Sequence, residues 1–310
     1  TPVDVIIPEG ATGKGIGNLL TALGLVEHEI LFRAAIRLDG TSRPIKHGQY
    51  TLHRGQSPTE ILQRLYEGPN KAFDPSTLPP DQIVTVPEGL TIAQAAEMFD
   101  DPGAFEASAA DPAYLDRLGL ETPTLEGFLM PNTYYFEKKP APSEVVERMI
   151  AQFQAEYAAL MVEFPDAAIK DPLRAVTIAS LVEEEAKTDE ERPVIASVIY
   201  NRLERNMTLD MDSTLQFALG KYGQRMLDED KEVQSPYNTY RNPGLPPGPI
   251  SSPGAASLRA ALHPAGTDFL YFVSNADGKS HTFSRTLQEH NAAVARYRRE
   301  MREQRAAPSQ

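Results

Sequence analysis

The segment from Ala175 to Glu185 combines an apolar run with three consecutive glutamates at its end. In a helix of about 3.6 residues per turn, a side chain lies beside those three, four and seven positions away. Only for Glu185 are these neighbours all large and apolar: Val182, Leu181 and Ile178. Burial against such groups disfavours the charged carboxylate and raises its pKa. Glu185 is therefore the candidate for a general acid that acts near neutral pH.

The other two glutamates of the cluster have less apolar surroundings, because each lies beside Ser180 in such a helix. Glu183 could also form an exposed salt bridge with Lys187, four residues later. The whole cluster could be a solvated helix end without catalytic function, since perturbed acids also occur outside active sites. The segment on its own leaves these interpretations open.

Other kinds of catalytic or metal site lack the residues that they require. The chain has no cysteine, and its six histidines include no HExxH pair, so neither a thiolate site nor a histidine metal site is expected. The segment Gly10–Gly15 has too few residues between its glycines for a phosphate-binding loop. No serine lies in a Gly-x-Ser-x-Gly motif, which a nucleophile elbow requires.

Two loops bring polar side chains together with aromatic ones. The first spans 125–134 and contains Glu126, and the second spans 235–240 and contains Asn238 and Tyr240. Aromatic faces and amide groups suit sugar rings, which present apolar faces and many hydroxyls. Each loop could equally hold a buried aromatic plug or a brace for the fold.

The 310-residue chain, with 41% hydrophobic and 24% charged residues, has the composition of a globular protein of about two domains. Its formal net charge of −13 argues against nucleic acid as a partner, because binding a phosphate backbone needs clustered Lys and Arg. No apolar run reaches the ~18 residues of a membrane-spanning helix. Because the chain begins with Thr1 and not with Met, we expect it to be a processed or truncated piece.

A short pattern occurs twice in the first hundred residues. In 5–12 and again in 84–91, a β-type run leads into Pro-Glu-Gly and then into a threonine placed to cap a helix. Thr91 and Gln94 also form a capping-box pattern. The first copy continues into two helical patterns and then a strand around 45–52, which is the order of a small α+β module.

The Pro-rich stretch 68–80 contains few core residues and is the predicted linker between two domains. It separates a module of residues 1–67 from a larger domain of residues 81–310. Within the larger domain we expect a small lead-in subdomain at 81–124, a core at 125–302 and a frayed tail at 303–310. The fold class predicted for both parts is α+β.

The first module resembles a LysM-type module, a family associated with binding glycans that contain N-acetylglucosamine. The likeness spans residues 3–54 and rests on the order of elements and on the segment from Ile45 to Leu52, which reads as a turn into a strand. It implies that residues 1–67 bind glycan. A small scaffold without a ligand would fit the same pattern.

Across nearly the whole chain, motifs occur in the order and spacing of the MltG-type (YceG-like) endolytic murein transglycosylases, which the sequence therefore resembles. The motifs are Leu125-Glu126-Gly127, Ala179 to Glu185, Asn201-Arg202-Leu203, Tyr237 to Tyr240, Leu245 to Ile250, His263-Pro264-Ala265, Tyr271-Phe272-Val273 and His281-Thr282-Phe283. In that family the catalytic acid is the second glutamate of an Ala-Ser-hydrophobic-hydrophobic-Glu-x-Glu motif, and Glu185 occupies this position. The chain departs from the family at Asn132, where an aspartate is usual, so Asn132 is not counted as catalytic.

The resemblance implies cleavage of the β-1,4 bond between N-acetylmuramic acid and N-acetylglucosamine, with 1,6-anhydro ends and a limit on the length of nascent strands. Glu185 would donate a proton to the glycosidic oxygen and then accept one from the muramyl C6 hydroxyl as it attacks C1. Since the substrate supplies the nucleophile, no cofactor is required. Glu126, Asn238 and Tyr240 would orient sugars or stabilise the transition state, and Glu183 would raise the pKa of Glu185 by like-charge repulsion.

Two other functions stay open at this point. A muramidase would use Glu185 as the acid and Glu126 or Glu183 as the base for a water, and a non-catalytic scaffold would bind cell-wall glycan through residues 1–67. The resemblance implies peptidoglycan glycan strands as the substrate and cell-wall synthases as candidate partners. It also implies that this chain is the periplasmic part of a single-pass inner-membrane protein, with the anchor in a missing segment before Thr1.

Overall fold

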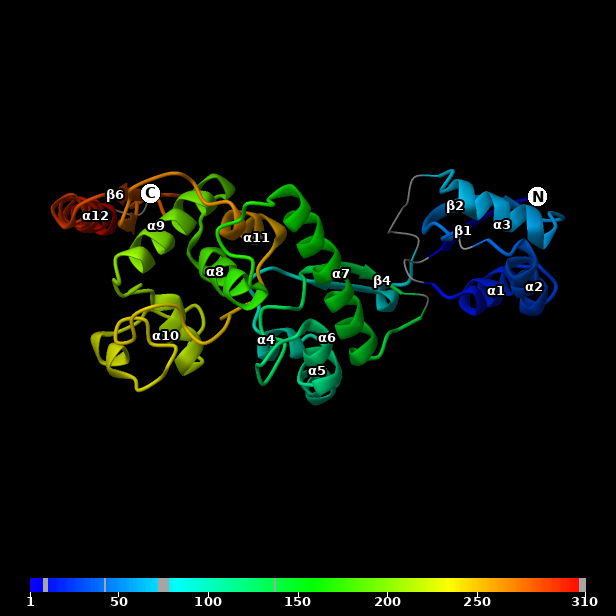
Figure 1. Cartoon of the computed structure of the whole chain (residues 1–310), viewed down its shortest axis with the longest axis horizontal. Coiled ribbons are helices and arrows are strands. Elements are labelled where there is room, and N and C mark those ends of the chain that lie inside the picture. The colour runs from blue at the N-terminus through cyan, green and yellow to red at the C-terminus, as the bar shows by residue number, and fades with distance from the viewer. Residues whose placement is uncertain (8–10, 42, 72–77, 137, 307–310) are drawn as a thin grey trace. The chain divides into compact units, whose positions relative to one another are not determined.

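The computed structural model describes residues 1–7, 11–41, 43–71, 78–136 and 138–306 (Figure 1). The chain forms two compact units. The first consists of Thr1–Thr85 and Thr133–Ala141, and the second consists of Val86–Asn132 and Pro142–Gln310. Helices and small two-stranded sheets make up the described residues, so the predicted α+β class is confirmed.

The first unit begins with a strand, two helices and a strand, as predicted. These are β1 (Pro2–Ile7), α1 (Gly13–Ala22), α2 (Glu29–Asp39) and β2 (Gly48–His53), and α3 (Pro58–Glu67) follows. β1 and β2 are antiparallel, in a register that pairs Pro2 with His53 and Ile7 with Gly48. The Thr12 side chain accepts a hydrogen bond of 3.0 Å from the Gly15 amide, so this threonine caps α1 as expected.

The core of the first unit forms between the β1–β2 pair and the three helices. Alternate residues of β1 point to one face, and Val5 and Ile7 are accordingly buried. The helices supply an apolar face at three- and four-residue spacing, with Ile16 and Leu20 from α1. The other large members of this core are Phe32, Tyr50, Leu52, Ile61, Leu62 and Leu65.

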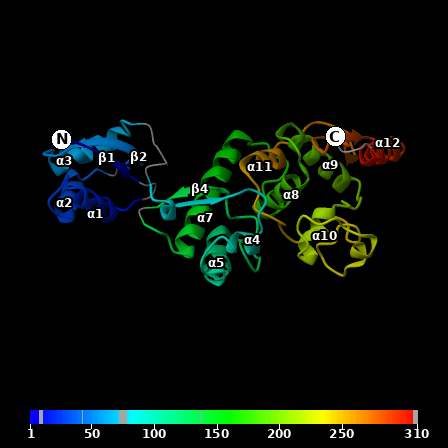
Figure 2. The ribbon, with the colours of Figure 1, turned by 180° about the vertical axis from the view of Figure 1, so that it is seen from behind.

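A second small sheet pairs β3 (Ile83–Val86) with β4 (Asn132–Tyr135). Because β4 pairs with β3, residues 133–141 group with the first unit, although the sequence placed them in the core of the larger domain. Of the predicted linker 68–80, residues 72–77 lie outside the described part of the chain. The next element along the chain is α7 (Pro142–Glu163), a long helix of the second unit (Figure 2).

The second unit is mainly helical. Before α7 it contains α4 (Ile92–Ala96), α5 (Pro102–Ala109) and α6 (Pro112–Leu118), and after α7 it contains α8 (Pro172–Glu185), α9 (Arg192–Glu204), α10 (Asp212–Leu219) and α11 (Ala255–Leu262). Short 3₁₀ turns lie at Pro80–Gln82, in the first unit, and at Asp189–Glu191 and Asp228–Glu232, in the second. The predicted capping box of Thr91 and Gln94 is confirmed at the start of α4.

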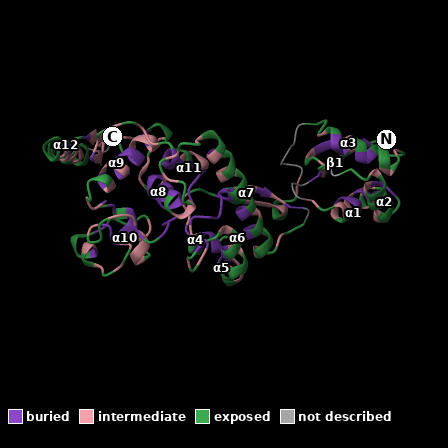
Figure 3. Ribbon diagram, in the orientation of Figure 1, coloured by how far each residue is buried: buried purple, intermediate pink, exposed green. Residues whose placement is uncertain are grey.

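Helix α8 is the central element of the second unit, because α9, α10 and α11 all pack against it (Figure 1). Every residue from Ala175 to Val182 is buried, as the purple ribbon of Figure 3 shows. A helix that is apolar on all sides belongs in a protein interior, and α8 matches that rule. The helix ends at Glu185, so the predicted transition from apolar run to acidic end is confirmed.

The second unit ends in a hairpin and a long helix. β5 (Tyr271–Ser274) and β6 (His281–Ser284) are antiparallel, and α12 (Leu287–Ala306) packs against both strands. The helix continues through residues 303–306, so the expected frayed tail begins inside a helix, which the arginine- and glutamate-rich sequence favours. Residues 307–310 lie outside the described part. In the described chain, no helix combines the length and the apolar character that crossing a bilayer needs.

Candidate active site

Glu185 lies at the C-terminal end of α8, partly buried, with its carboxylate beside the start of α10. Burial raises the pKa of this carboxyl group, the direction that its apolar helix neighbours predicted. The Ser213 hydroxyl donates a hydrogen bond of 2.7 Å to Glu185 Oε1 and acts in the opposite direction on the pKa. Asp212 raises the pKa of Glu185 by charge repulsion, while His281 and Lys187 lower it.

Tyr240 is close to this carboxylate through its partner Asp212. The Tyr240 hydroxyl donates a hydrogen bond of 2.7 Å to Asp212 Oδ1. Burial, together with this bond, raises the pKa of Tyr240. Lys231 Nζ lies 5.2 Å from the centre of the Tyr240 ring. Tyr240 is partly exposed, and the charge of Glu185 is near enough to raise its pKa as well.

Glu183 has a different role from the one that the sequence suggested. Arg192 Nη1 donates to Glu183 Oε1 at 3.0 Å, and the Gly254 amide donates to Oε2 at 3.0 Å. The expected partner Lys187 is not the cation that pairs with it. The charge repulsion that raises the pKa of Glu185 comes from Asp212, whereas Glu183 raises the pKa values of Glu184 and Glu88.

Glu184 and Ser213, the hydrogen-bond donor of Glu185, both line a cavity of about 120 Å³. The cavity is lined mainly by polar residues and one apolar wall: Gly89, Thr91, Gln94, Glu184, Ser213, Gln216, Tyr222, Gly223 and Ile250. Burial of the carboxyl group raises the pKa of Glu184 to about 7. The residue as a whole is exposed, however, so solvent screens this carboxyl more than that of Glu185. Burial therefore acts more strongly on the carboxyl group of Glu185 than on that of Glu184.

Glu126 lies in the first of the two aromatic loops, at the start of α4. Both of its carboxylate oxygens accept from the Ile92 amide, at 3.2 and 3.1 Å, which caps the helix. Burial raises the pKa of Glu126 to about 7 despite these bonds. A Cβ atom on Gly127, whose φ is +82°, would lie 2.4 Å from Pro249 Cβ, so only glycine lets this loop pack so closely against Pro249.

Two turns are tied to α8 and to each other near this site. The Ile250 amide donates to Ser180 Oγ of α8 at 3.1 Å. The second Pro-Glu-Gly turn joins the same loop, since the Gly89 amide donates to the Ser252 carbonyl at 2.9 Å and the Ser252 amide donates to the Leu90 carbonyl at 2.8 Å. Several motifs that are distant in sequence thus meet around the end of α8.

Asn238 is a brace within its loop and not a sugar ligand. Its side chain is fully buried, and its amide nitrogen donates to the carbonyls of Lys231 at 2.8 Å and Val233 at 2.9 Å. Its amide oxygen accepts from the Tyr240 amide at 3.0 Å. The predicted contact with substrate is therefore replaced by an indirect role, in which Asn238 holds the backbone of Tyr240.

Sequence reasoning missed Ser213, Asp212, Arg192 and the His281–Glu191 pair. His281 Nδ1 lies 2.8 Å from Glu191 Oε2, and the His281 amide donates to Glu191 Oε1 at 2.6 Å. Asp212 and Ser213 open a helix, where such residues are usually caps, so their types gave no signal of a site. Within the described ranges, no group of His, Asp or Glu side chains is arranged to hold a metal ion.

The sequence profile of the YceG-like family matches residues 5–296 of this chain, nearly its whole length. The chain belongs to the YceG-like family. The match includes the end of α8, both aromatic loops and the β5–β6 hairpin. The resemblance inferred from the spaced motifs is therefore confirmed.

Known relatives agree with this membership. The endolytic murein transglycosylase of Bacillus subtilis (strain 168) is 34% identical over 96% of this chain and 85% of its own length. That of Streptococcus pneumoniae serotype 2 is 30% identical over 95% of this chain, which spans 58% of that protein. A yceG-like protein from Listeria monocytogenes, solved by crystallography, is 29% identical and superimposes with a TM-score of 0.60, covering 94% of this chain and 99% of that one.

Proposed function

We propose that this chain is an endolytic murein transglycosylase, an enzyme that cuts within peptidoglycan strands without using water. The observation that carries the proposal is the carboxyl group of Glu185. Burial keeps its pKa high, one oxygen is held by Ser213, and it occupies the position of the acid in the family motif. Family membership over residues 5–296 and the name shared by the relatives support the same activity.

The chemistry needs a single carboxyl group that acts twice. Protonated Glu185 gives its proton to the glycosidic oxygen, and the bond from that oxygen to C1 of the muramyl sugar breaks. The C6 hydroxyl oxygen of the same sugar then bonds to C1, and its proton passes to the Glu185 carboxylate. The acid is regenerated, and a 1,6-anhydro ring forms without a water. A carboxyl group with these two influences suits both steps, since burial favours the protonated acid and the Ser213 hydroxyl stabilises the carboxylate.

A muramidase is supported less well by the same residues. Hydrolysis needs a second carboxylate that serves as nucleophile or as base for a water. Glu183 is neutralised by Arg192, and Glu126 is held by the Ile92 amide at the start of α4. Both of the second carboxylates that the sequence offered therefore hold parts of the fold together. A purely binding scaffold would need no proton donor of raised pKa.

Analysis of the reaction products tests this function. The purified chain is incubated with peptidoglycan, and soluble fragments are identified by mass spectrometry. We expect fragments several disaccharides long that end in 1,6-anhydro-muramic acid, each lighter by one water than a hydrolysis product. Fragments with reducing-end muramic acid would identify a hydrolase, and an absence of any cleavage would favour the scaffold.

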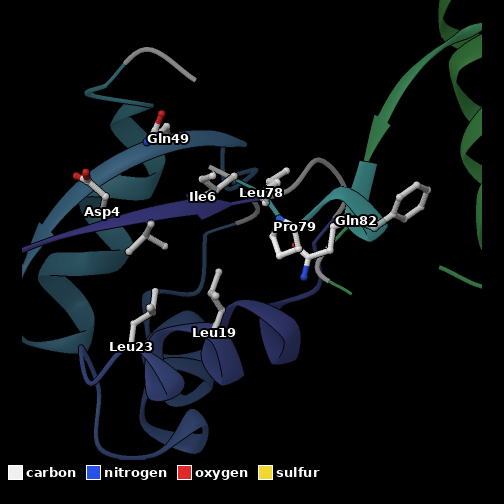
Figure 4. Close-up of a pocket in the computed structure, with 10 residues that line it drawn as sticks. Asp4, Ile6, Leu19, Leu23, Gln49, Leu78, Pro79 and Gln82 are labelled. Carbon is white, nitrogen blue, oxygen red and sulfur yellow. The ribbon is translucent and has the colours of Figure 1, made fainter. Parts of the chain in front are cut away.

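We also propose that the first unit binds glycan. A cavity of about 370 Å³ in this unit is lined by apolar side chains of α1 and β1 and by the segment 78–82 (Figure 4). Leu19 and Leu23 of α1 point toward the strands across this cavity, and Asp4 and Gln49 add polar groups at its edge. An apolar wall with a polar rim suits a sugar ring, which is the chemistry that the LysM-like resemblance implies.

The binding of intact peptidoglycan sacculi by full-length variants tests this second proposal. Leu19→Gln should weaken sedimentation with sacculi several-fold, because it puts an amide in the apolar wall. Leu38→Gln is the matched control, since Leu38 belongs to the same unit and is 86% exposed outside the cavity. Equal binding by both variants and the wild type would remove this cavity from consideration.

For the cellular location, we propose that the chain works outside the cytoplasmic membrane, where murein lies, close to cell-wall synthases as partners. The family resemblance further suggests a single membrane helix in a segment before Thr1. The complete gene gives the test: an apolar stretch of ~20 residues should precede Thr1. A cleavable signal peptide in that place would contradict the anchor and leave the proposed chemistry unaffected.

A further inference from the structure

Ser213 is the one described residue that donates a hydrogen bond to the Glu185 carboxylate. Its side chain is buried, only 8% exposed, at the start of α10, and the two partners are 28 residues apart in the chain. The hydroxyl reaches Oε1 at 2.7 Å, the length of a strong bond to a charged acceptor. Oε2 of Glu185 carries no such restraint within the described residues.

The start of α10 is itself fixed in place, so Ser213 has little freedom to follow Glu185. The Thr214 hydroxyl donates to the Met211 carbonyl at 2.7 Å and lies 2.9 Å from the Thr239 hydroxyl. The Met211 amide donates to Thr239 Oγ1 at 3.1 Å. Thr214 and Thr239 are both buried. These hydrogen bonds of Met211 and Thr214 hold the backbone on both sides of Ser213 and so make it a rigid donor.

We propose that Ser213 is a positioning residue for Glu185, one that holds Oε1 and leaves Oε2 directed at the scissile bond. The inference rests on the proposed function, in which Glu185 must be an acid in one step and a base in the next. Burial alone would favour the protonated acid and disfavour formation of the carboxylate that the second step needs. A donor to the ionised form counteracts burial and keeps both states accessible.

The charged and titratable groups around Glu185 come from five parts of the second unit. Glu184 adjoins it on α8, Lys187 follows that helix, Asp212 opens α10, Tyr240 lies in the loop after it, and His281 belongs to β6. Asp212 acts against ionisation of Glu185, whereas Lys187 and His281 favour it. Among these neighbours and Ser213, only Ser213 acts through a direct hydrogen bond to the carboxylate. Removal of the Ser213 hydroxyl should therefore raise the pKa of Glu185.

The decisive experiment titrates the Glu185 carboxyl by ¹³C NMR in the full chain with carboxyl-labelled glutamate, using Glu185→Gln to assign the signal. In Ser213→Ala the midpoint should rise by about one pH unit, the size expected for losing a hydrogen bond to a charged group. Ser213→Thr, which keeps the hydroxyl, should restore the wild-type midpoint. Ser197→Ala is the matched control, because Ser197 is a buried serine that bonds to the Val194 carbonyl and lies outside the site.

The pH dependence of turnover provides the second measurement. In Ser213→Ala the alkaline limb of kcat should move to higher pH, the maximum should fall about tenfold, and KM should stay the same. If Ser213→Ala does not fold, Ser213→Cys, which has a weaker donor of similar size, should give a smaller shift in the same direction.

The two proposals fail in different ways. An unchanged Glu185 midpoint in Ser213→Ala, or in a folded Ser213→Cys, would overturn the positioning role while anhydro products still supported the transglycosylase. Hydrolytic products from the wild type would overturn the function and leave the titration result intact. A fall in kcat that Ser213→Thr did not rescue would also count against the positioning role.

Discussion

Glu183 and Glu185 lie two residues apart at the end of α8, but their carboxylates have different kinds of partner. On the side of α9 and α11, Glu183 forms a buried ion pair with Arg192. The Glu183 side chain is 8% exposed and the Arg192 side chain is 12% exposed. On the side of α10, Glu185 meets a serine hydroxyl and no directly bonded cation in the described chain. The residue type is the same, and the partner distinguishes a paired structural anion from the carboxyl group that we propose as the proton donor.

This difference shows how one helix end can serve packing and chemistry together. Arg192 also bonds to Ser257 Oγ of α11 at 2.5 Å, so the Glu183 pair ties α8 to the start of α9 and to α11. That connection fixes the backbone that carries Glu185. A charged pair on one side therefore provides rigidity, while the other side keeps a carboxyl whose protonation can change.

The largest effect should come from removing the proton donor. Glu185→Gln should lower turnover on peptidoglycan at least ~100-fold, the usual loss for one general acid. Thermal unfolding should show no loss of stability, because a neutral amide avoids the cost of burying a charge. The measurement is product release followed by mass spectrometry alongside a melting curve. Near-normal turnover would reassign the acid to Glu184, whose carboxyl lines the adjoining cavity.

Replacing Glu183, on the side of α8 that meets α9 and α11, should lower stability and leave turnover nearly unchanged. Glu183→Gln should reduce the free energy of unfolding by about 2 kcal/mol, because it leaves Arg192 without its buried partner. Turnover of the folded variant should remain within a few-fold of the wild type. Chemical denaturation gives the stability, and a double-mutant cycle with Arg192→Met isolates the pair.

A surface pair supplies the control for this second prediction. Glu163 and Arg259 are each about half exposed, at 48% and 49%, so Glu163→Gln should change the unfolding free energy by less than ~0.5 kcal/mol. Equal losses in the two glutamine variants would mean that burial does not distinguish the pairs. A large loss of turnover in Glu183→Gln at unchanged stability would return Glu183 to the catalytic set.

Local patterns sufficed to predict α8, its acidic end, the Thr12 and Thr91 caps and the raised pKa of Glu185. Each depends on neighbours within about a turn or two of the same helix. The roles of Glu183 and Asn238 could not be predicted in this way. The role of Glu183 depends on its ion pair with Arg192, nine residues later in the chain. The hydrogen-bond donor of Glu185 lies 28 residues away in the chain.

Asn238 illustrates why residue type alone was misleading. An amide in an aromatic loop suits a sugar, but the same amide suits three backbone groups of its own loop, and the loop geometry decides between them. Family motifs pointed to this segment, and its Tyr240 hydroxyl bonds to Asp212 at the start of α10. They did not reveal that the Tyr240 hydroxyl bonds to Asp212, while the Asn238 side chain holds the backbone of Tyr240.

The smallest effect should distinguish two tyrosines of that loop. Tyr240→Phe removes the hydroxyl that donates to Asp212 Oδ1, which frees Asp212 to move relative to Glu185. We expect turnover to fall roughly three- to tenfold, the cost of about one hydrogen bond to a charged group, with the ring and its packing retained. Tyr237→Phe is the matched control, because no bond from the Tyr237 hydroxyl to Glu185, Asp212 or Ser213 exists in the described residues, and it should leave turnover unchanged. Kinetics of both variants at one pH, with melting curves to confirm folding, make the test. Equal losses of turnover in the two variants would mean that the bond from Tyr240 to Asp212 does not affect Glu185. The difference between the surroundings of Glu183 and Glu185 would then depend on Ser213 alone.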